Sequence, residues 1–156
     1  DVVKKSSKYK ECKELINWVL ESEHVNQYNE IKKHKSFYNE CLNHKKLLKK
    51  LLVTLKKQNK KVVGYGASTK GNVLLQFCGI NSKIINNIAE VNKYKFNRYT
   101  PGSKIKIVSE KSVRLKKPDY MLVLPWHFKD YIVKRERNFL KNGGKLIFPL
   151  PEIEIV

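Results

Sequence analysis

The residues best suited to bind an anion are three closely spaced glycines, Gly64, Gly66 and Gly71. A short β-branched run precedes them, and an apolar helical pattern follows over residues 73–78. This order predicts a strand, a tight turn and the start of a helix. Amide N–H groups are free at a helix N-terminus, and a turn without side chains lets an acceptor approach them. The pattern therefore predicts a phosphate-bearing ligand, with a nucleotide as the first candidate.

The glycine spacing departs from both standard phosphate-binding motifs. Thr69 stands where the dinucleotide fingerprint requires its third glycine. Asn72 stands where a Walker-type loop has a lysine after its last glycine. The spacing therefore disfavours a routine NAD or ATP site, and a turn that only packs a strand against its helix remains the alternative.

Further polar residues are predicted to lie at the same edge of the sheet. Glu90 ends a strand, where a Rossmann-type domain places a carboxylate for ribose hydroxyls; an exposed strand-end carboxylate is the alternative. Trp126 follows another strand and either stacks on a base or sugar or caps the sheet. His127 has no partner carboxylate in view, so a structural role or the orienting of a ligand is favoured over catalysis. Lys70 is placed to touch a phosphate, although one lysine among many is weak evidence.

The chain has a net charge of +19, from 33 basic and 14 acidic residues. Arginine occurs only four times, at Arg98, Arg114, Arg135 and Arg137, and the lysines are spread along the whole sequence. Specific readers of nucleic acids rely on arginine forks and interleaved aromatic residues. The charge therefore indicates a lysine-rich composition more than a nucleic-acid footprint, although a basic nucleic-acid-binding module remains an alternative.

The cysteines and histidines do not form a metal-binding pattern. Cys12, Cys41 and Cys78 are isolated and lack CxxC spacing, which predicts reduced thiols and a cytoplasmic setting. On a helix, His34 would lie roughly 10 Å from Cys41, too far for both to join His44 around one ion. The sequence also contains no run of apolar residues long enough to span a membrane and no signal-peptide pattern.

The first third of the chain is predicted to be helical. Residues 8–23 and 26–59 carry apolar side chains at steps of three, four or seven. These side chains are Cys12, Leu15, Ile16, Val19 and Leu20 in the first helix, and Ile31, Tyr38, Cys41, Leu48, Leu52 and Leu55 in the second. The longer stripe is expected to dock on a neighbouring domain or on the sheet. We therefore predict a helical extension over residues 1–59 and a Rossmann-like domain over residues 60–156.

From residue 61 onward the pattern alternates between strands and helices. Strands are predicted at 62–63, 84–90, 105–108, 120–124 and 145–148, and helices at 69–78 and 128–141. This alternation predicts an α/β fold with a doubly wound, Rossmann-like parallel sheet. Right-handed crossovers then place ligands beyond the carboxyl ends of the strands.

Four ordered blocks within residues 11–156 carry a resemblance to a known family. They are Val63–Asn72, the segment from Asn92–Lys95 through Tyr99–Gly102, the segment from Pro118–Tyr120 through Leu124–Trp126, and Gly143–Glu154. With these blocks the chain resembles the C-terminal domain of the nucleotide-sugar C-methyltransferases. These enzymes use S-adenosylmethionine to methylate a keto-deoxysugar.

The resemblance implies a three-part enzyme of which only the last part is present. The family's N-terminal part binds zinc through cysteines, its middle domain binds S-adenosylmethionine, and its C-terminal domain helps to hold a nucleotide-diphosphate sugar. The first residue is Asp1 and the only methionine is Met121, which agrees with a piece of a longer chain. By this resemblance the domain binds no cofactor or metal and carries no catalytic residue, so it binds substrate without transferring methyl groups alone.

The resemblance also implies which residues contact the substrate. The positions that match the family's glycine motif are Gly64, Tyr65, Gly66, Ala67, Ser68, Lys70, Gly71 and Asn72, and Glu90, Trp126 and His127 complete the expected site. Two positions depart from the family pattern: His127 stands where asparagine is usual, and Glu90 where aspartate is usual. Both substitutions keep hydrogen-bonding capacity. The nicotinamide-nucleotide-binding half of an oxidoreductase is the other alternative function.

Overall fold

The computed structural model describes residues 7, 8 and 10–156, and the chain divides into two compact units, Asp1–Leu42 and Asn43–Val156. Residue 9, within the predicted first helix, lies outside the described residues. Helix α1 (Lys13–Val25) belongs to the first unit, and α2 (Ile31–Lys57) begins there. Gln27, with a φ of 58°, lies between them in the left-handed region, which explains why the predicted second helix starts later than residue 26.

Helix α1 has the predicted apolar stripe but buries none of it. No residue of α1 is buried, and Leu15, Trp18 and Leu20 are each more than half exposed. In contrast, Leu48 and Leu52 in the second part of α2 are fully buried in the core of the second unit. The sheet begins at Val62, two residues after the predicted boundary at residue 60, and the compact unit begins earlier, at Asn43, because these leucines pack into its core.

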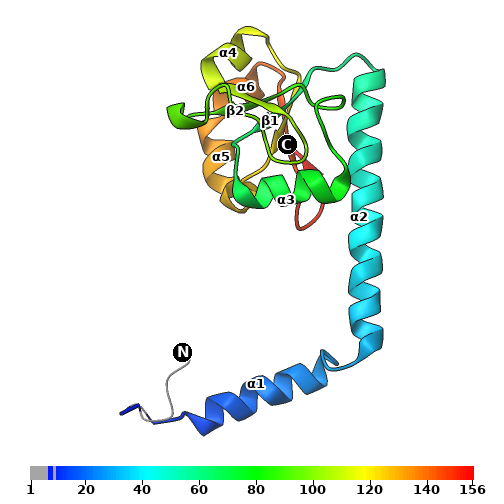
Figure 1. The fold of residues 1–156 in the computed structure, drawn as a ribbon, viewed down its shortest axis with the longest axis vertical. Helices are drawn as coiled ribbons and strands as arrows, with labels where there is room; N and C mark the ends of the chain where they lie inside the picture. The colour runs from blue at the N-terminus through cyan, green and yellow to red at the C-terminus, as the bar shows by residue number, and fades with distance from the viewer. Residues whose placement is uncertain (1–6, 9) are drawn as a thin grey trace. The chain divides into compact units, whose positions relative to one another are not determined.

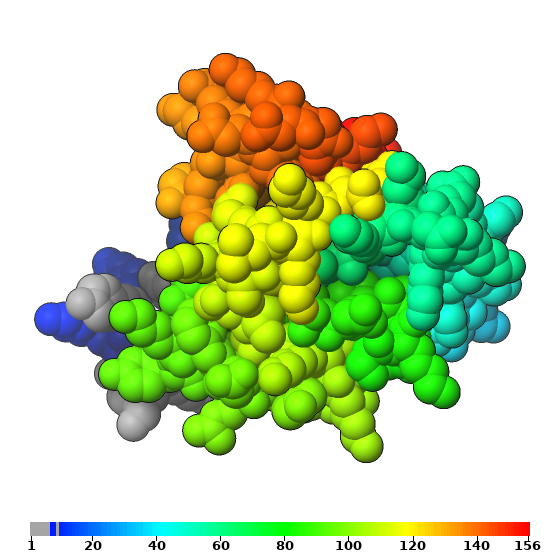
Figure 2. All heavy atoms as spheres, turned by 90° about the horizontal axis from the view of Figure 1, so that it is seen from above, coloured from blue at the N-terminus to red at the C-terminus, as the bar shows by residue number. Residues whose placement is uncertain are grey.

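The second unit is built on a six-stranded sheet, which confirms the predicted α/β fold (Figure 1). The strands are β1 (Val62–Tyr65), β2 (Asn87–Glu90), β3 (Lys106–Ser109), β4 (Tyr120–Val123), β5 (Lys145–Phe148) and β6 (Glu154–Ile155). Their order is β3-β2-β1-β4-β5-β6, and all neighbours are parallel except β6, which runs antiparallel to β5. The turns that lead into β1, β2 and β4 lie on the face shown in Figure 2.

Helices cover both faces of the sheet, because successive strand side chains point to opposite sides. The helices after β1 are α3 (Thr69–Cys78), α4 (Glu110–Leu115), α5 (Lys129–Arg135) and α6 (Arg137–Lys141), with short 3-10 turns η1 (Lys93–Lys95) and η2 (Trp126–Phe128). Leu122 faces the core beneath α2 and α3, whereas its neighbours Met121 and Val123 face the core beneath α4 and α5. Helix α4 and strand β6 are additions to the predicted pattern.

The glycine turn packs tightly against the segment that follows β4. Gly66 has a φ of 75°, and a Cβ built on it would lie 2.9 Å from the Pro125 ring. A Cβ on Gly71, in the first turn of α3, would lie 2.4 Å from Leu124 Cβ. Both glycines are therefore required for packing, and this close approach fixes α3 on the sheet beside the turn.

We expect the substitution Gly71→Ala to destabilise the protein. Alanine is the better helix former by roughly 1 kcal/mol, so helix propensity alone would stabilise the variant. The contact with Leu124 reverses the sign, and the free energy of unfolding should fall by about 1–3 kcal/mol in a denaturant titration. Val73→Ala on the exposed side of α3 is the matched control and should change stability little. An unchanged or raised stability of Gly71→Ala would contradict the packing described above.

Candidate functional site

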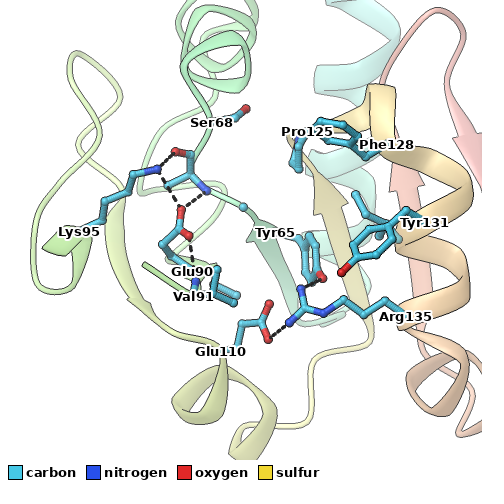
Figure 3. Close-up of a pocket in the computed structure, with 14 residues that line it drawn as sticks. Tyr65, Ser68, Glu90, Val91, Lys95, Glu110, Pro125, Phe128, Tyr131 and Arg135 are labelled. Carbon is cyan, nitrogen blue, oxygen red and sulfur yellow. Dashed lines mark hydrogen bonds and ion pairs between the residues drawn. The ribbon is translucent and has the colours of Figure 1, made fainter. Parts of the chain in front are cut away.

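A cavity of about 280 Å³ opens at the carboxyl ends of β1, β2 and β4 (Figure 3). Strand β1 lies between β2 and β4, so the chain leaves β1 toward one side of the sheet and later returns to its other side. This reversal is the topological switch point at which open α/β sheets bind their ligands. The cavity is lined by Tyr65, Gly66, Ala67, Ser68, Ala89, Glu90, Val91, Lys95, Glu110, Pro125, Phe128, Tyr131, Ile132 and Arg135.

The carboxylate of Glu90 holds the glycine turn to the end of β2. Its Oε2 accepts hydrogen bonds from the Ala67 amide at 3.0 Å and from Lys95 Nζ at 3.3 Å. Its Oε1 accepts from the amides of Val91 at 2.8 Å and Asn92 at 3.0 Å. A carboxylate offers about four acceptor positions, so these four donors occupy its capacity. A ribose hydroxyl could bond to Glu90 only by displacing one of them.

Glu90 is 7 % exposed, so it is not a solvent-exposed strand-end carboxylate. Burial opposes its ionisation, but the amides of Asn92 and Val91 and the Lys95 ammonium outweigh that cost and hold its pKa below the usual value. Lys95 Nζ also donates to the Ala67 carbonyl at 3.0 Å, so its side chain bridges η1 and the glycine turn (Figure 3). The turn is therefore fixed by an internal anion and an internal cation.

Fewer amide N–H groups are free to bind an anion at the N-terminus of α3 than the glycine pattern suggests. Ser68 is the N-cap, and its Oγ accepts a hydrogen bond from the Gly71 amide at 3.0 Å. The Ala67 amide is already bonded to Glu90. The amides of Thr69 and Lys70, both on exposed residues, are the donors that remain for an outside acceptor.

The structure places the predicted site residues in two groups. Tyr65, Gly66, Ala67, Ser68 and Glu90 line the cavity, whereas Gly64, Lys70, Gly71, Asn72, Trp126 and His127 do not. A Cβ on Gly64 would lie 2.7 Å from Ile88 Cγ1, which gives this glycine a packing role. Trp126 is half-buried against both core clusters. His127 is exposed, with its ring centroid 4.3 Å from that of Phe128. Their roles as substrate contacts stay predictions.

Two aromatic residues that the sequence did not single out form part of the cavity wall. Phe128 and Tyr131 are 57 % and 67 % exposed and stand beside Pro125 (Figure 3). They are three residues apart, so a helical reading of the segment after β4 would place them on one face. An aromatic pair at that spacing, shortly after a central strand, was the signal available in the sequence.

A second buried carboxylate, Glu136, organises a charged network behind the cavity. It is 2 % exposed and accepts hydrogen bonds from the Tyr65 hydroxyl at 3.0 Å and from Arg114 Nη2 at 2.9 Å. The Tyr65 hydroxyl in turn accepts a hydrogen bond from Arg135, which also donates to Glu110 Oε2 at 2.7 Å (Figure 3). Burial, reinforced by the Glu136 charge, raises the pKa of Tyr65, so its phenol stays neutral and able to donate.

The predicted single helix over residues 128–141 is wrong in one respect, because the segment is divided at Glu136 into α5 and α6. Glu136 lies four residues after Ile132 and four before Leu140, on the apolar stripe of that segment. A charged residue on an apolar stripe signals a buried polar partner, but its partners come from β1 and α4, far away in the sequence. The periodicity therefore indicated a helix and not the network.

Every charged side chain that faces the cavity has a partner of opposite charge within the protein. Glu90 is paired with Lys95, and Arg135 is paired with Glu110. The cavity is therefore close to neutral although the chain carries a net charge of +19. Within the described part of the chain, no three His, Cys, Asp or Glu side chains are grouped so that they could hold a metal ion.

Residues 2–151 match the family described as the C-methyltransferase C-terminal domain. The chain belongs to this family. The resemblance drawn from the four sequence blocks is thereby confirmed. The chain is also similar to C-methyltransferase NovU of Streptomyces niveus, with 39 % identity over 97 residues. These residues are 62 % of this chain and 23 % of NovU, so the match spans less than a quarter of that relative's length.

This C-methyltransferase C-terminal domain thus has a cavity at the switch point of its sheet. The charged side chains that line the cavity are held by ion pairs within the protein. Among the described helices, none combines the length and apolar character needed to cross a membrane. The family membership agrees with the expectation of a domain from a larger methyltransferase.

We expect Glu90→Gln to loosen the glycine turn. The glutamine NH₂ cannot accept the hydrogen bond of the Ala67 amide, so stability at neutral pH should fall by about 1–3 kcal/mol. Because the folded-state pKa of Glu90 is lowered, its contribution is present at neutral pH and is lost as the pH falls below about 4. The difference between wild type and variant should therefore shrink in acid, as measured by thermal unfolding across pH. The exposed Glu152→Gln should match wild type throughout, and a pH-independent difference for Glu90→Gln would contradict the role of its charge.

We expect Glu136→Gln to destabilise the domain by about 1–3 kcal/mol, because Arg114 and Tyr65 lose the carboxylate that pairs with them. The loss should be smaller than for a fully buried pair, because the Arg114 side chain is 41 % exposed and can be partly solvated. Glu110→Gln, at a side chain that is 17 % exposed, should cost less. Equal losses for the two variants in chemical denaturation would show that the buried carboxylate is not the centre of the network.

Proposed function

We propose that this domain holds a nucleotide-diphosphate sugar while its sugar is methylated by a preceding domain of the same enzyme. The observation that carries the proposal is a cavity at the sheet's switch point, beside a glycine turn, in a member of the C-methyltransferase C-terminal family. Such a cavity is where doubly wound sheets bind ligands with phosphates and rings. S-adenosylmethionine would supply the methyl group from the preceding domain, and zinc would belong to the part before that.

We place an uncharged ring of the ligand, either base or sugar, inside the cavity. Its walls include the exposed aromatic faces of Phe128 and Tyr131, and its charged groups are already paired. A diphosphate inside the cavity would have to compete with Glu90 and Glu110 for cations, at a large cost in desolvation. The volume of about 280 Å³ is near the lower limit for ligand sites, which suits one part of a nucleotide sugar and not all of it.

The diphosphate is then best accommodated outside the cavity, at the first turn of α3. The amides of Thr69 and Lys70 are the donors left there, and the Lys70 ammonium adds a positive charge nearby. Ser68 lines the cavity and caps α3, so the two parts of the ligand would meet at this residue. In this arrangement the glycine turn still lies beside the phosphates, but it offers them fewer free amide N–H groups than its sequence suggests.

The domain contributes to methyl transfer by positioning. It fixes the sugar so that the carbon next to its ketone faces the methyl donor, which replaces a bimolecular encounter with a reaction between two held groups. The exposed apolar side of α1 is proposed to pack against the preceding domain, since Leu15, Trp18 and Leu20 are not covered within their own unit. The matched residues make up less than a quarter of NovU, and we propose that a longer protein provides that surface.

Thermal shift and calorimetry with the purified chain test the proposal. A deoxythymidine diphosphate sugar should raise Tm and bind more tightly than thymidine, whereas NAD should have no effect. Tyr131→Ala should weaken the binding of both ligands by about fivefold, since a stacked ring contributes on the order of 1 kcal/mol. Lys70→Gln should weaken the diphosphate ligand and leave thymidine unchanged, with Lys46→Gln on the exposed side of α2 as the control. Stabilisation by NAD but by no nucleotide sugar would instead favour an oxidoreductase.

A further inference from the structure

A second groove, of about 710 Å³, lies at the opposite edge of the sheet from the cavity. It is formed where α2 leads into β1, where the chain enters β2, and where α4 leads into β4. These three segments lie on the face drawn in Figure 2. They are the turn after residue 57, the green segment before β2 and the yellow end of α4. Small-molecule sites of doubly wound sheets form at the other edge, so this groove belongs to a different kind of site.

The groove is more basic than the composition of the chain explains. Five of its thirteen lining residues are lysines, whereas Lys and Arg together make up 33 of the 156 residues of the chain. None of the lining residues, all of which lie in the described part of the chain, is acidic. Lysines near the C-termini of α2 and α4 are favoured by the helix dipoles, but Lys60 lies beyond the end of its helix and Lys117 beyond the C-cap of α4.

The two turns that form the groove are fixed against each other. Asn59 and Lys117 both have positive φ, at 57° and 47°, and each redirects the chain from a helix into a strand. The Lys61 amide donates to Asp119 Oδ2 at 2.7 Å, and the Asp119 amide donates to the Lys61 carbonyl at 2.9 Å. The walls are therefore preorganised, which reduces the entropy cost of binding a partner.

The groove also presents apolar surface between its lysines. Leu115 is 78 % exposed at the end of α4, and the half-buried Ile84 lines the groove with it, whereas Pro118 is buried. No aromatic residue and no arginine is among the described residues that line it. Nucleic-acid sites rely on arginine forks or on aromatic stacking, so an apolar floor without either fits an extended peptide better.

We propose that this groove binds an acidic segment of a protein partner in which carboxylates alternate with aliphatic side chains. The carboxylates pair with Lys60, Lys116 and Lys117, whose side chains make no hydrogen bond or ion pair with any other described residue. The aliphatic side chains pack on Leu115 and on the half-buried Ile84. The interaction is independent of the proposed function, because it uses the other edge of the sheet.

The test is fluorescence anisotropy with a labelled peptide of repeated Glu-Leu-Ser units and the full chain. The peptide should bind saturably, and its version with Gln in place of Glu should not bind. Replacing Lys60, Lys116 and Lys117 together by glutamine should weaken binding by about tenfold, because three charge pairs are lost. Leu115→Ser should weaken it by about threefold without changing the dependence on salt, since it removes apolar contact and no charge.

The matched control removes the same charge elsewhere, by replacing Lys35, Lys46 and Lys50 on the exposed side of α2 with glutamine. It should leave peptide affinity within twofold of wild type. An equal loss in both triple variants would show that only net charge attracts the peptide, which would overturn the proposal. So would the absence of saturable binding, or tighter groove-dependent binding of single-stranded oligothymidylate. Melting temperatures within a few degrees of wild type would exclude unfolding as the cause of a loss.

Discussion

The carboxylate of Glu90 is the interaction on which the carboxyl edge of the sheet depends. It receives four donors from three segments: the glycine turn, the end of β2 with the residues after it, and η1. Without an acceptor at that point, the Ala67 amide would be left unbonded in a partly buried turn, at a cost of about 1–3 kcal/mol. The position of the turn, and with it one wall of the cavity, therefore follows from one buried anion.

This arrangement changes how the glycine turn is understood. A helix N-terminus attracts anions, and the turn does hold one, but the anion is a side chain of the protein itself. Each glycine meets a packing constraint: Gly64 against Ile88, Gly66 against Pro125 and Gly71 against Leu124. The turn is thus required by the fold first, and any phosphate must use the donors that the fold leaves over. The neutral cavity and the two remaining amides follow from the same constraint.

Local periodicity was enough to predict most of the fold. Helix α3 and strand β5 have the predicted bounds, because each is defined by a continuous pattern between clear start and stop residues. The division at Glu136, helix α4 and the partners of Glu90 were not predictable in the same way. They depend on contacts between residues that are distant in sequence, such as Tyr65 with Glu136, and no local pattern specifies which buried charge meets which partner. Four cavity residues, Tyr65, Gly66, Ala67 and Ser68, came from the match to the family's glycine motif, and Glu90 came from its position at the end of a strand. The aromatic wall required knowledge of where α5 lies.

The two edges of the sheet differ because charge is paired at one and left unpaired at the other. At the carboxyl edge, buried carboxylates must be matched by cations, so Lys95, Arg114 and Arg135 are held inside the protein's own network. At the amino edge, exposed lysines bear no such cost, since solvent screens them, and they are free to meet an external anion. A chain with a large excess of lysine can therefore keep a neutral ligand cavity, provided that the charged side chains lining that cavity are paired with one another. Glu90 and Glu110 pair with Lys95 and Arg135 in this way, and the groove at the other edge, which has no acidic lining, retains surplus positive charge.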